Sequence, residues 1–202
     1  MTVLFTVWGY NVTVIEFVSV ISALLAIGLC INGTRWAWPL YFLSSLLYGW
    51  LFLEVDLFAS AATQLIFMAA AVWGWFSWGQ DGVRMPGRLT PAIRLGGAVG
   101  VLVLWVPVAL LLQSVHDASP RWDAVMLVGS LAGQLLMVWQ KTEAWPVWIA
   151  VNAVGAVLYT SQSLYFTALF YSVLIVMAVA GWRTWSTRAD DDVTSSPAAT
   201  HA

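Results

Sequence analysis

Two carboxamides and two indoles are the side chains of this sequence best placed to bind a small polar ring. Trp145, Trp148 and Asn152 recur at intervals of three and four residues, so they lie along one face of a helix. Asn152 and Gln64 each lie roughly 10 Å inside an apolar run, counted at about 1.5 Å per residue. Amides offer donors and acceptors, and an indole face attracts a cationic ring. These four residues are therefore predicted to bind a flat, uncharged or weakly cationic polar solute.

Each of these residues also has a structural explanation. Trp145 opens its apolar run, where interfacial tryptophans anchor helices, and the same explanation is expected for Trp75, Trp78, Trp182 and Trp185. Asn152 and Gln64 are of the type that holds membrane helices together by hydrogen bonds. Secondary candidates for substrate binding, for which structural use is favoured, are Trp38, Tyr41, Gln134 and Tyr159.

Catalytic, metal and cofactor sites are not expected. His116 and His201 lie outside the apolar runs, so no Ser–His arrangement can form within a membrane, and they are far from each other and from any acid cluster. The single Cys30 allows neither a disulfide framework nor a thiolate metal site. No GxxxxGK[ST] loop occurs, which excludes ATP hydrolysis by this chain. The sequence therefore argues against an enzyme.

The composition places the chain in a lipid bilayer. Of the 202 residues, 61% are apolar and only 9% are charged, and the mean hydropathy is +0.83. Long apolar runs favour helices over a barrel. The predicted fold class is an all-α integral membrane protein with seven spans, at about 13–31, 37–53, 57–78, 95–113, 122–140, 145–161 and 163–183.

Seven of the eight Lys and Arg residues fall on one side of these spans, and only Arg121 falls on the other. By the positive-inside rule the seven-residue side is cytoplasmic, which predicts an external N-terminus and a cytoplasmic C-terminus. No basic groove suited to nucleic acid is present.

The sequence repeats itself at an offset of 107 residues. Residues 37–78 align without a gap on residues 144–185, and eleven of the 42 positions are identical. An offset of four spans means that both copies cross the membrane in the same direction. Extending the offset backward pairs span 1 with span 5, so each copy has three helices and span 4 is a linker, a parallel-repeat (3+1+3, SWEET-like) arrangement.

The predicted domains follow this division. They are an external N-terminus (1–12), a first three-helix repeat (13–78), a cytoplasmic loop and linker helix (79–121), a second three-helix repeat (122–185) and a disordered cytoplasmic tail (186–202). Asn152 aligns with Ser45, and Gln64 aligns with Tyr171. Polar groups that differ between the copies suit an asymmetric substrate.

Three features together resemble the Pnu family of bacterial vitamin transporters, most closely its nicotinamide riboside branch. They are the 3+1+3 helices, the GW-x-x-W run that closes each half, and the W-x-x-W-x-x-x-N run at Trp145, Trp148 and Asn152. The family's glutamine in the third span falls on Gln64. The resemblance implies facilitated diffusion of nicotinamide riboside for NAD biosynthesis across the bacterial inner membrane. It also implies trapping by a cytoplasmic kinase, and a homotrimer.

Alternatives remain open at this point. Another Pnu-type carrier would take thiamine, riboflavin or a deoxynucleoside, and a non-transporting membrane scaffold or sensor would also tolerate a duplicated bundle. Ion-driven carriers usually bury a carboxylate or histidine in the transport path. Here Glu54, Asp56, His116 and Asp117 lie in loops, and Glu16 and Asp123 lie near external helix ends. Passive uniport by alternating access is therefore expected.

Overall fold

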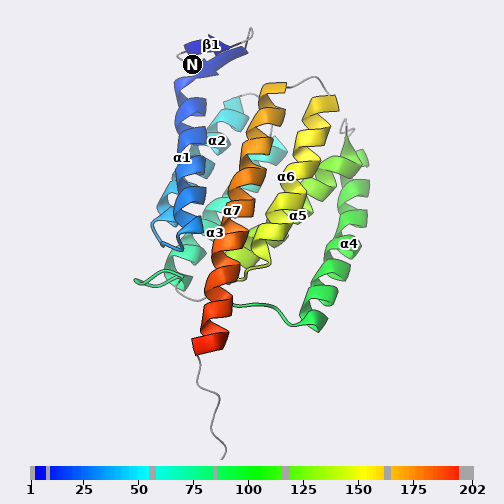
Figure 1. The fold of residues 1–202 in the computed structure, drawn as a ribbon. Helices are drawn as coiled ribbons and strands as arrows, with labels where there is room; N and C mark the ends of the chain where they lie inside the picture. The colour runs from blue at the N-terminus through cyan, green and yellow to red at the C-terminus, as the bar shows by residue number, and fades with distance from the viewer. Residues whose placement is uncertain are drawn as a thin grey trace, which may run out of the picture. The chain divides into compact units, whose positions relative to one another are not determined.

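Seven helices and one two-stranded sheet make up the residues that the computed structural model describes, which are 3–7, 10–54, 58–83, 86–114, 119–161 and 165–195. Figure 1 labels these elements. The strands are β1 (Val3–Val7) and β2 (Tyr10–Thr13), and the helices are α1 (Val14–Ile31), α2 (Ala37–Glu54), α3 (Phe58–Ser77), α4 (Pro91–Ser114), α5 (Pro120–Val138), α6 (Ala144–Ser161) and α7 (Tyr165–Ser195). The helical class is confirmed, and each predicted span overlaps one helix.

The chain divides into two compact units, residues 1–83 and residues 84–202. In the first unit α1 packs on α2, and α2 packs on α3. In the second unit α4 packs on α5, α5 on α6, and α6 on α7. Each unit is therefore built by helices that follow one another in the chain, as short connections require.

The tail prediction is wrong for residues 186–195, because α7 continues as a helix to Ser195. Gly181, Trp185 and Ala189 recur at a spacing of four and are all buried, so one packed face extends past the apolar span. Polar composition predicted disorder here, but the packed face supports the helix. Residues 196–202 lie outside the described part of the chain.

The N-terminal residues form a hairpin that the sequence analysis did not predict. Strands β1 and β2 pair antiparallel, with Val7 opposite Tyr10 and an irregularity between Val3 and Phe5. The Phe5 ring meets the Phe17 ring of α1 edge to face, with centroids 6.0 Å apart. Thr13 then caps α1, because its hydroxyl accepts the Glu16 N–H at 3.2 Å. The hairpin thus leads directly into the first helix.

An indole seated on a glycine joins α2 to α3 in the first unit. Trp38 is fully buried, and a Cβ added at Gly74 would overlap its ring. Trp78 closes the contact edge to face, with ring centroids 5.0 Å apart. Gly74 thus permits close contact between the two helices.

The repeat-equivalent residues form the same contact between α6 and α7 in the second unit. A Cβ at Gly181 would overlap the Trp145 ring, and Trp185 meets Trp145 at 5.4 Å and 87°. Trp78 and Trp185 are 2% and 0% exposed. Their predicted role as interfacial anchors is therefore wrong, since both rings lie in the helix packing rather than at a water boundary.

The turns before α2 and α6 repeat the same backbone hydrogen bonds, although their sequences differ. Gly33 N–H bonds the Cys30 carbonyl at 2.9 Å, and Gln140 N–H bonds the Met137 carbonyl at 3.0 Å, which is the same bond shifted by 107 residues. Gly33 and Gln140 both have positive φ, at 75° and 57°. The duplication therefore extends in backbone geometry beyond the segment where residues match.

In each turn, the carbonyl of the residue with positive φ also accepts a backbone hydrogen bond from the segment that follows α3. Val83 N–H bonds the Gly33 carbonyl within the first unit at 2.6 Å. Gly87 N–H bonds the Gln140 carbonyl within the second unit at 2.9 Å. Each turn thus has its own backbone attachment to this segment.

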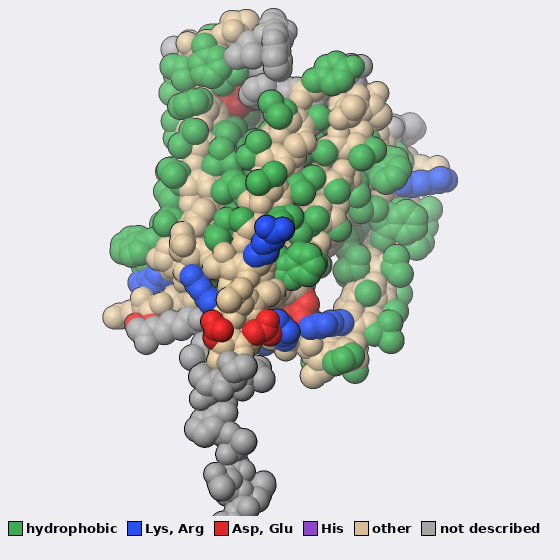
Figure 2. All heavy atoms as spheres, in the orientation of Figure 1, with side chains coloured by type: hydrophobic (Ala, Val, Ile, Leu, Met, Phe, Trp, Pro, Cys, Tyr) green, Lys and Arg blue, Asp and Glu red, His purple; other side chains and the backbone are tan. Residues whose placement is uncertain are grey.

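Four helices are long and apolar enough to cross a membrane by length and composition. They are Val14–Ile31, Pro91–Ser114, Ala144–Ser161 and Thr167–Asp191, and the described part of α3 contributes a shorter apolar helix, Thr63–Ser77. Apolar side chains cover the visible faces of α4 and α7, and charged side chains gather towards the end of α7 (Figure 2). Among the described residues, charge is thus concentrated at helix ends, as a bilayer requires.

The glycine contacts can be tested with a matched set of alanine variants. We expect Gly181→Ala and Gly74→Ala to lower the melting temperature in detergent, because the new methyl group would enter an indole ring, with a cost of about 1–3 kcal/mol. Gly97→Ala is the control, since nothing lies within 4 Å of a Cβ at that position. Equal melting temperatures for all three variants would contradict this packing.

Candidate functional site

Helix α6 carries three of the four predicted site residues, and α5 provides the surface against which the middle one lies. A Cβ added at Gly133 would meet the Trp148 indole at 3.0–3.3 Å, so this ring lies flat against α5 where a side chain is missing. Trp148 remains partly exposed. Asn152 follows one turn later on the same face of α6. An indole and an amide are therefore neighbours along one helix, as predicted.

Two amides in the second unit are buried without a side-chain partner in the described structure. Asn152 of α6 and Gln134 of α5 are each 5% exposed, and neither side chain has a hydrogen bond to another described residue. Their amide atoms are not among the side-chain atoms that are fully buried and unpaired in the described structure, so they reach the accessible surface. These groups are therefore available for a ligand, and the structure gives Gln134 the same environment as Asn152.

Trp145 has a different environment from Trp148. It is 2% exposed and is enclosed by Gly181 and Trp185, and its Nε1 is buried without a hydrogen-bond partner. The structure gives Trp145 a packing role. A direct substrate contact by this ring stays a prediction.

In the first unit, Gln64 lies over a glycine of the neighbouring helix. A Cβ at Gly49 of α2 would meet the Gln64 Cβ at 3.4 Å. Gln64 is half-buried, and its amide has no hydrogen bond to a described residue. Gln64 thus resembles Asn152 in presenting an unpaired amide, now on α3.

The remaining candidates of the first unit take part in packing. The Tyr41 ring lies 5.9 Å from that of Trp38, with an angle of 41° between the ring planes. Trp38 is fully buried, with Nε1 unpaired, as in its repeat mate Trp145. Both residues therefore fit the structural alternative given for them from sequence.

Tyr159 also has a protein partner. Its ring lies 5.2 Å from that of Tyr171, with an angle of 31° between the ring planes. Tyr171 in turn lies against Gly155. Tyr171 is the repeat mate of Gln64, so the second unit has a tyrosine pair where the first unit has a free amide.

A polar cluster at one end of the second unit was missed by the sequence analysis. Glu143 accepts two bonds from the Arg94 guanidinium, at 2.7 and 2.8 Å, and a third from the Leu89 N–H at 3.0 Å. Arg88 pairs with Asp190 at 2.8 Å. These partners lie 49 and 102 residues apart (143 − 94 and 190 − 88). Local patterns therefore give no signal for the cluster.

Comparison with known proteins gives one family. Residues 13–187 match the family described as "Nicotinamide mononucleotide transporter". The nicotinamide riboside transporter PnuC of Escherichia coli (strain K12) is 28% identical over 207 residues, covering 88% of this chain and 87% of that protein. The riboflavin/roseoflavin transporter RibM of Streptomyces davaonensis is 28% identical over 197 residues, covering 93% and 92%. The crystal structure of the vitamin B3 transporter PnuC has the same fold, with a TM-score of 0.72 and 19% identity over 88% of this chain and 82% of that one.

The packing role of Trp145 can be separated from a role in binding. We expect Trp145→Leu and Trp38→Leu to destabilise the protein by about 2–4 kcal/mol, because each leaves a cavity beside a glycine. Trp122→Leu is the matched control, since Trp122 is 53% exposed. Thermal unfolding in detergent measures the difference. A Trp145→Leu variant as stable as the control would refute the packing role.

Proposed function

Because the chain belongs to the nicotinamide mononucleotide transporter family and is a multi-pass membrane protein, we propose that it carries nicotinamide riboside across the membrane. The relative from Escherichia coli is named for this substrate. The proposed binding residues are Asn152, Trp148, Gln64 and Gln134, with Trp145 and Trp38 holding their helices in place. This assigns transport rather than catalysis to the chain.

The unpaired amide of Asn152, one turn from the indole of Trp148, carries this proposal. A ribose hydroxyl or the carboxamide of nicotinamide would satisfy the amide, and the indole face would attract the pyridinium ring by about 1–2 kcal/mol when water is excluded. The unpaired donors and acceptor of the Asn152 amide thus match the polar groups of the substrate.

The positions of the described cations favour the riboside over the mononucleotide that gives the family its name. A phosphate group taken into the membrane needs Arg or Lys as a partner. The seven Lys and Arg residues that the structure describes lie between helices, near helix starts or in the last part of α7. The proposed site therefore has amides and indoles for the nucleoside, and no group for a phosphate.

We propose the 3+1+3 arrangement as the framework for transport. Residues 13–78 and 122–185 would form parallel repeats with the linker helix between them in the chain. The recurring turns and the two indole-on-glycine contacts support the duplication. Alternating access would then follow from rocking of the repeats, with the N-terminus outside and the C-terminus in the cytoplasm of a bacterial inner membrane.

We propose that transport is passive. Among the described helices, Glu16 and Asp123 lie in first turns and Glu54 ends α2, whereas Asp56, His116 and Asp117 lie outside the described residues. Ion coupling usually needs a carboxylate or histidine at depth. Direction would be set by a cytoplasmic kinase that phosphorylates the riboside, and the family resemblance implies a homotrimer.

A second candidate substrate is riboflavin, because RibM matches over 93% of the chain. Like nicotinamide riboside, riboflavin has a flat ring for an indole to contact and hydroxyl groups for an amide to bind. Thiamine and deoxynucleosides are further family substrates, and a scaffold without transport would bind none of them.

Amide truncation tests the proposed site. We expect Asn152→Ala and Gln64→Ala to weaken nicotinamide riboside binding by about 1–3 kcal/mol, because each removes hydrogen bonds to a buried polar ligand. Calorimetry on purified protein measures this loss against a panel of riboside, mononucleotide, riboflavin, thiamine and thymidine. Gln113→Ala is the matched control, since this amide is exposed near the end of α4.

Melting temperature separates the substrate role from the structural one. Both amides lack partners in the described structure, so truncation should leave stability unchanged. Loss of stability together with affinity would instead indicate that these amides hold helices together. A variant with unchanged affinity would remove its residue from the site.

Uptake into liposomes that contain only this protein tests passive transport. We expect radiolabelled riboside to equilibrate at the same rate with and without a protonophore, because Glu16, Glu54 and Asp123 lie at the ends of their helices rather than at mid-span, where a coupling acid is needed. Liposomes without protein give the leak rate. Abolition of uptake by the protonophore would overturn uniport, and uptake equal to the leak would favour the scaffold alternative.

A further inference from the structure

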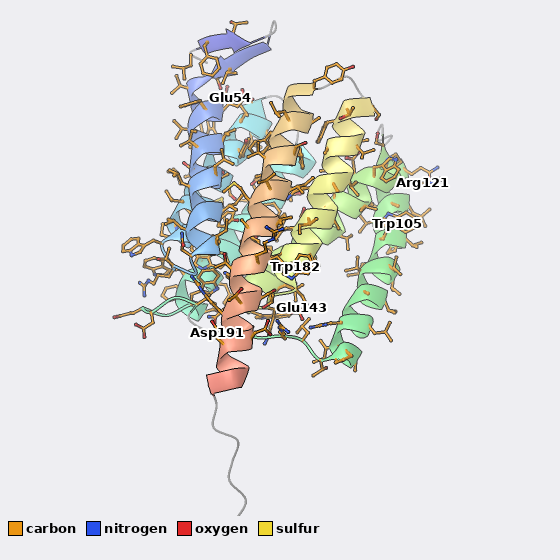
Figure 3. All side chains as sticks on the ribbon, viewed as in Figure 1. Glu54, Trp105, Arg121, Glu143, Trp182 and Asp191 are labelled. Atoms are coloured by element: carbon orange, nitrogen blue, oxygen red, sulfur yellow. The ribbon has the colours of Figure 1, made fainter. Side chains whose placement is uncertain are left out.

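A cavity of about 440 Å³ opens at the charged end of the second unit. It is lined by Arg88, Arg94, Thr142, Glu143, Pro146, Trp182 and Ser186. Glu143, which directly precedes α6, and Trp182 of α7 both line it (Figure 3), and the space-filling view shows the surface hollowed between the ends of α4 and α7 (Figure 2). This cavity is separate from Trp148 and Asn152, which do not line it.

Glu143 fixes the position of one cavity arginine. Its Oε1 accepts from both Nε and Nη2 of Arg94, which holds the guanidinium in a single orientation. Arg88 donates through Nη2 to Asp190 and to the Ser186 carbonyl. In the described structure each guanidinium keeps an Nη1 group with no acceptor. Each guanidinium therefore has one carboxylate partner, Asp190 for Arg88 and Glu143 for Arg94, and keeps donors for a further acceptor.

The repeat-equivalent place in the first unit is filled by protein. Trp75, the mate of Trp182, is covered by Trp36 at 5.2 Å and by the Arg35 guanidinium at 3.7 Å from its ring centroid. In the second unit Thr142 and Glu143 occupy the positions of Arg35 and Trp36. Trp182 is 45% exposed and has no ring contact in the described structure. The second unit therefore has a cavity beside the Trp182 indole, where the first unit has the side chains of Arg35 and Trp36.

We propose that this cavity binds the phosphate headgroup of a phospholipid, with the phosphate between Arg88 and Arg94 and the glycerol backbone against Trp182. Arginine pairs between helices at the cytoplasmic face suit anionic headgroups, and tryptophan suits the headgroup level of a bilayer. Glu143 acts as a positioning residue for Arg94.

The surroundings favour a lipid over a soluble phosphate ester. The cavity lies between α4 and α7, and α4 is apolar, with Leu102 and Val103 each 64% exposed. Acyl chains would cover such a surface, whereas a soluble ester would leave it bare. The second unit thus offers guanidinium groups for the phosphate and, on the same unit, an exposed apolar helix for the acyl chains.

Native mass spectrometry of the purified protein with three matched ligands tests the proposal. The ligands are a phosphatidylglycerol, the diacylglycerol with the same acyl chains, and glycerol 1-phosphate. We expect phosphatidylglycerol to bind about tenfold or more tightly than either of the others, because only it offers both phosphate and tails. Equal binding of the diacylglycerol would overturn a phosphate site, and equal binding of glycerol 1-phosphate would overturn a lipid one.

Variants then locate the site. We expect Arg88→Gln with Arg94→Gln to lower phosphatidylglycerol binding to the diacylglycerol level. Arg121→Gln is the control, because Arg121 is exposed at the opposite end of the second unit (Figure 3). Wild-type binding by the double variant would place the lipid elsewhere. The comparison of ligands on the unaltered protein decides the phosphate question even if the double variant fails to fold.

Discussion

Close contact between an indole and a glycine is the interaction on which both units depend. In a bilayer, apolar side chains gain little by leaving lipid, so helices associate through tight packing rather than through the hydrophobic effect. Trp38 on Gly74 and Trp145 on Gly181 provide such packing, and each places the largest side chain of one helix where the next has none. The two contacts allow α2 to approach α3 closely and α6 to approach α7 closely. Gln64 of α3 and Asn152 of α6 are therefore carried by helices that pack through these contacts.

The repeated frame makes the differences between the copies informative. At equivalent positions the first unit has Ser45 and Gln64, and the second has Asn152 and Tyr171. Tyr171 has a ring contact with Tyr159, whereas its repeat mate Gln64 on α3 has no hydrogen bond to a described residue. If the two copies carried identical polar residues, an asymmetric solute would leave some of these residues without a hydrogen-bond partner. Polar residues that differ between the copies avoid this loss of hydrogen bonds.

The helices could be predicted from sequence, whereas several contacts could not. Apolar runs bounded by polar residues locate all seven helices, because the bilayer demands continuous apolar length. The same reasoning failed at residues 186–195, where Ala189 extends a packed face that composition does not reveal. It also placed Trp78 and Trp185 at the water boundary, since depth along a helix does not say which neighbour a ring faces. The Arg94–Glu143 pair joins residues 49 positions apart (143 − 94), and sequence spacing carries no information about it.

Hydroxyl and amide side chains behave differently in this structure, and the difference identifies the proposed site. Thr160, Ser172 and Thr184 each donate to the carbonyl four residues earlier in their own helix, at 2.7–3.0 Å. A short hydroxyl can always be satisfied in this way, so its presence in a membrane helix implies no ligand. The amides of Asn152 and Gln134 make no such bond in the described structure, yet both are buried. Hydrogen bonds for these amides come from outside the helix that carries them, either from water or, in the proposed function, from a solute that brings both donors and acceptors.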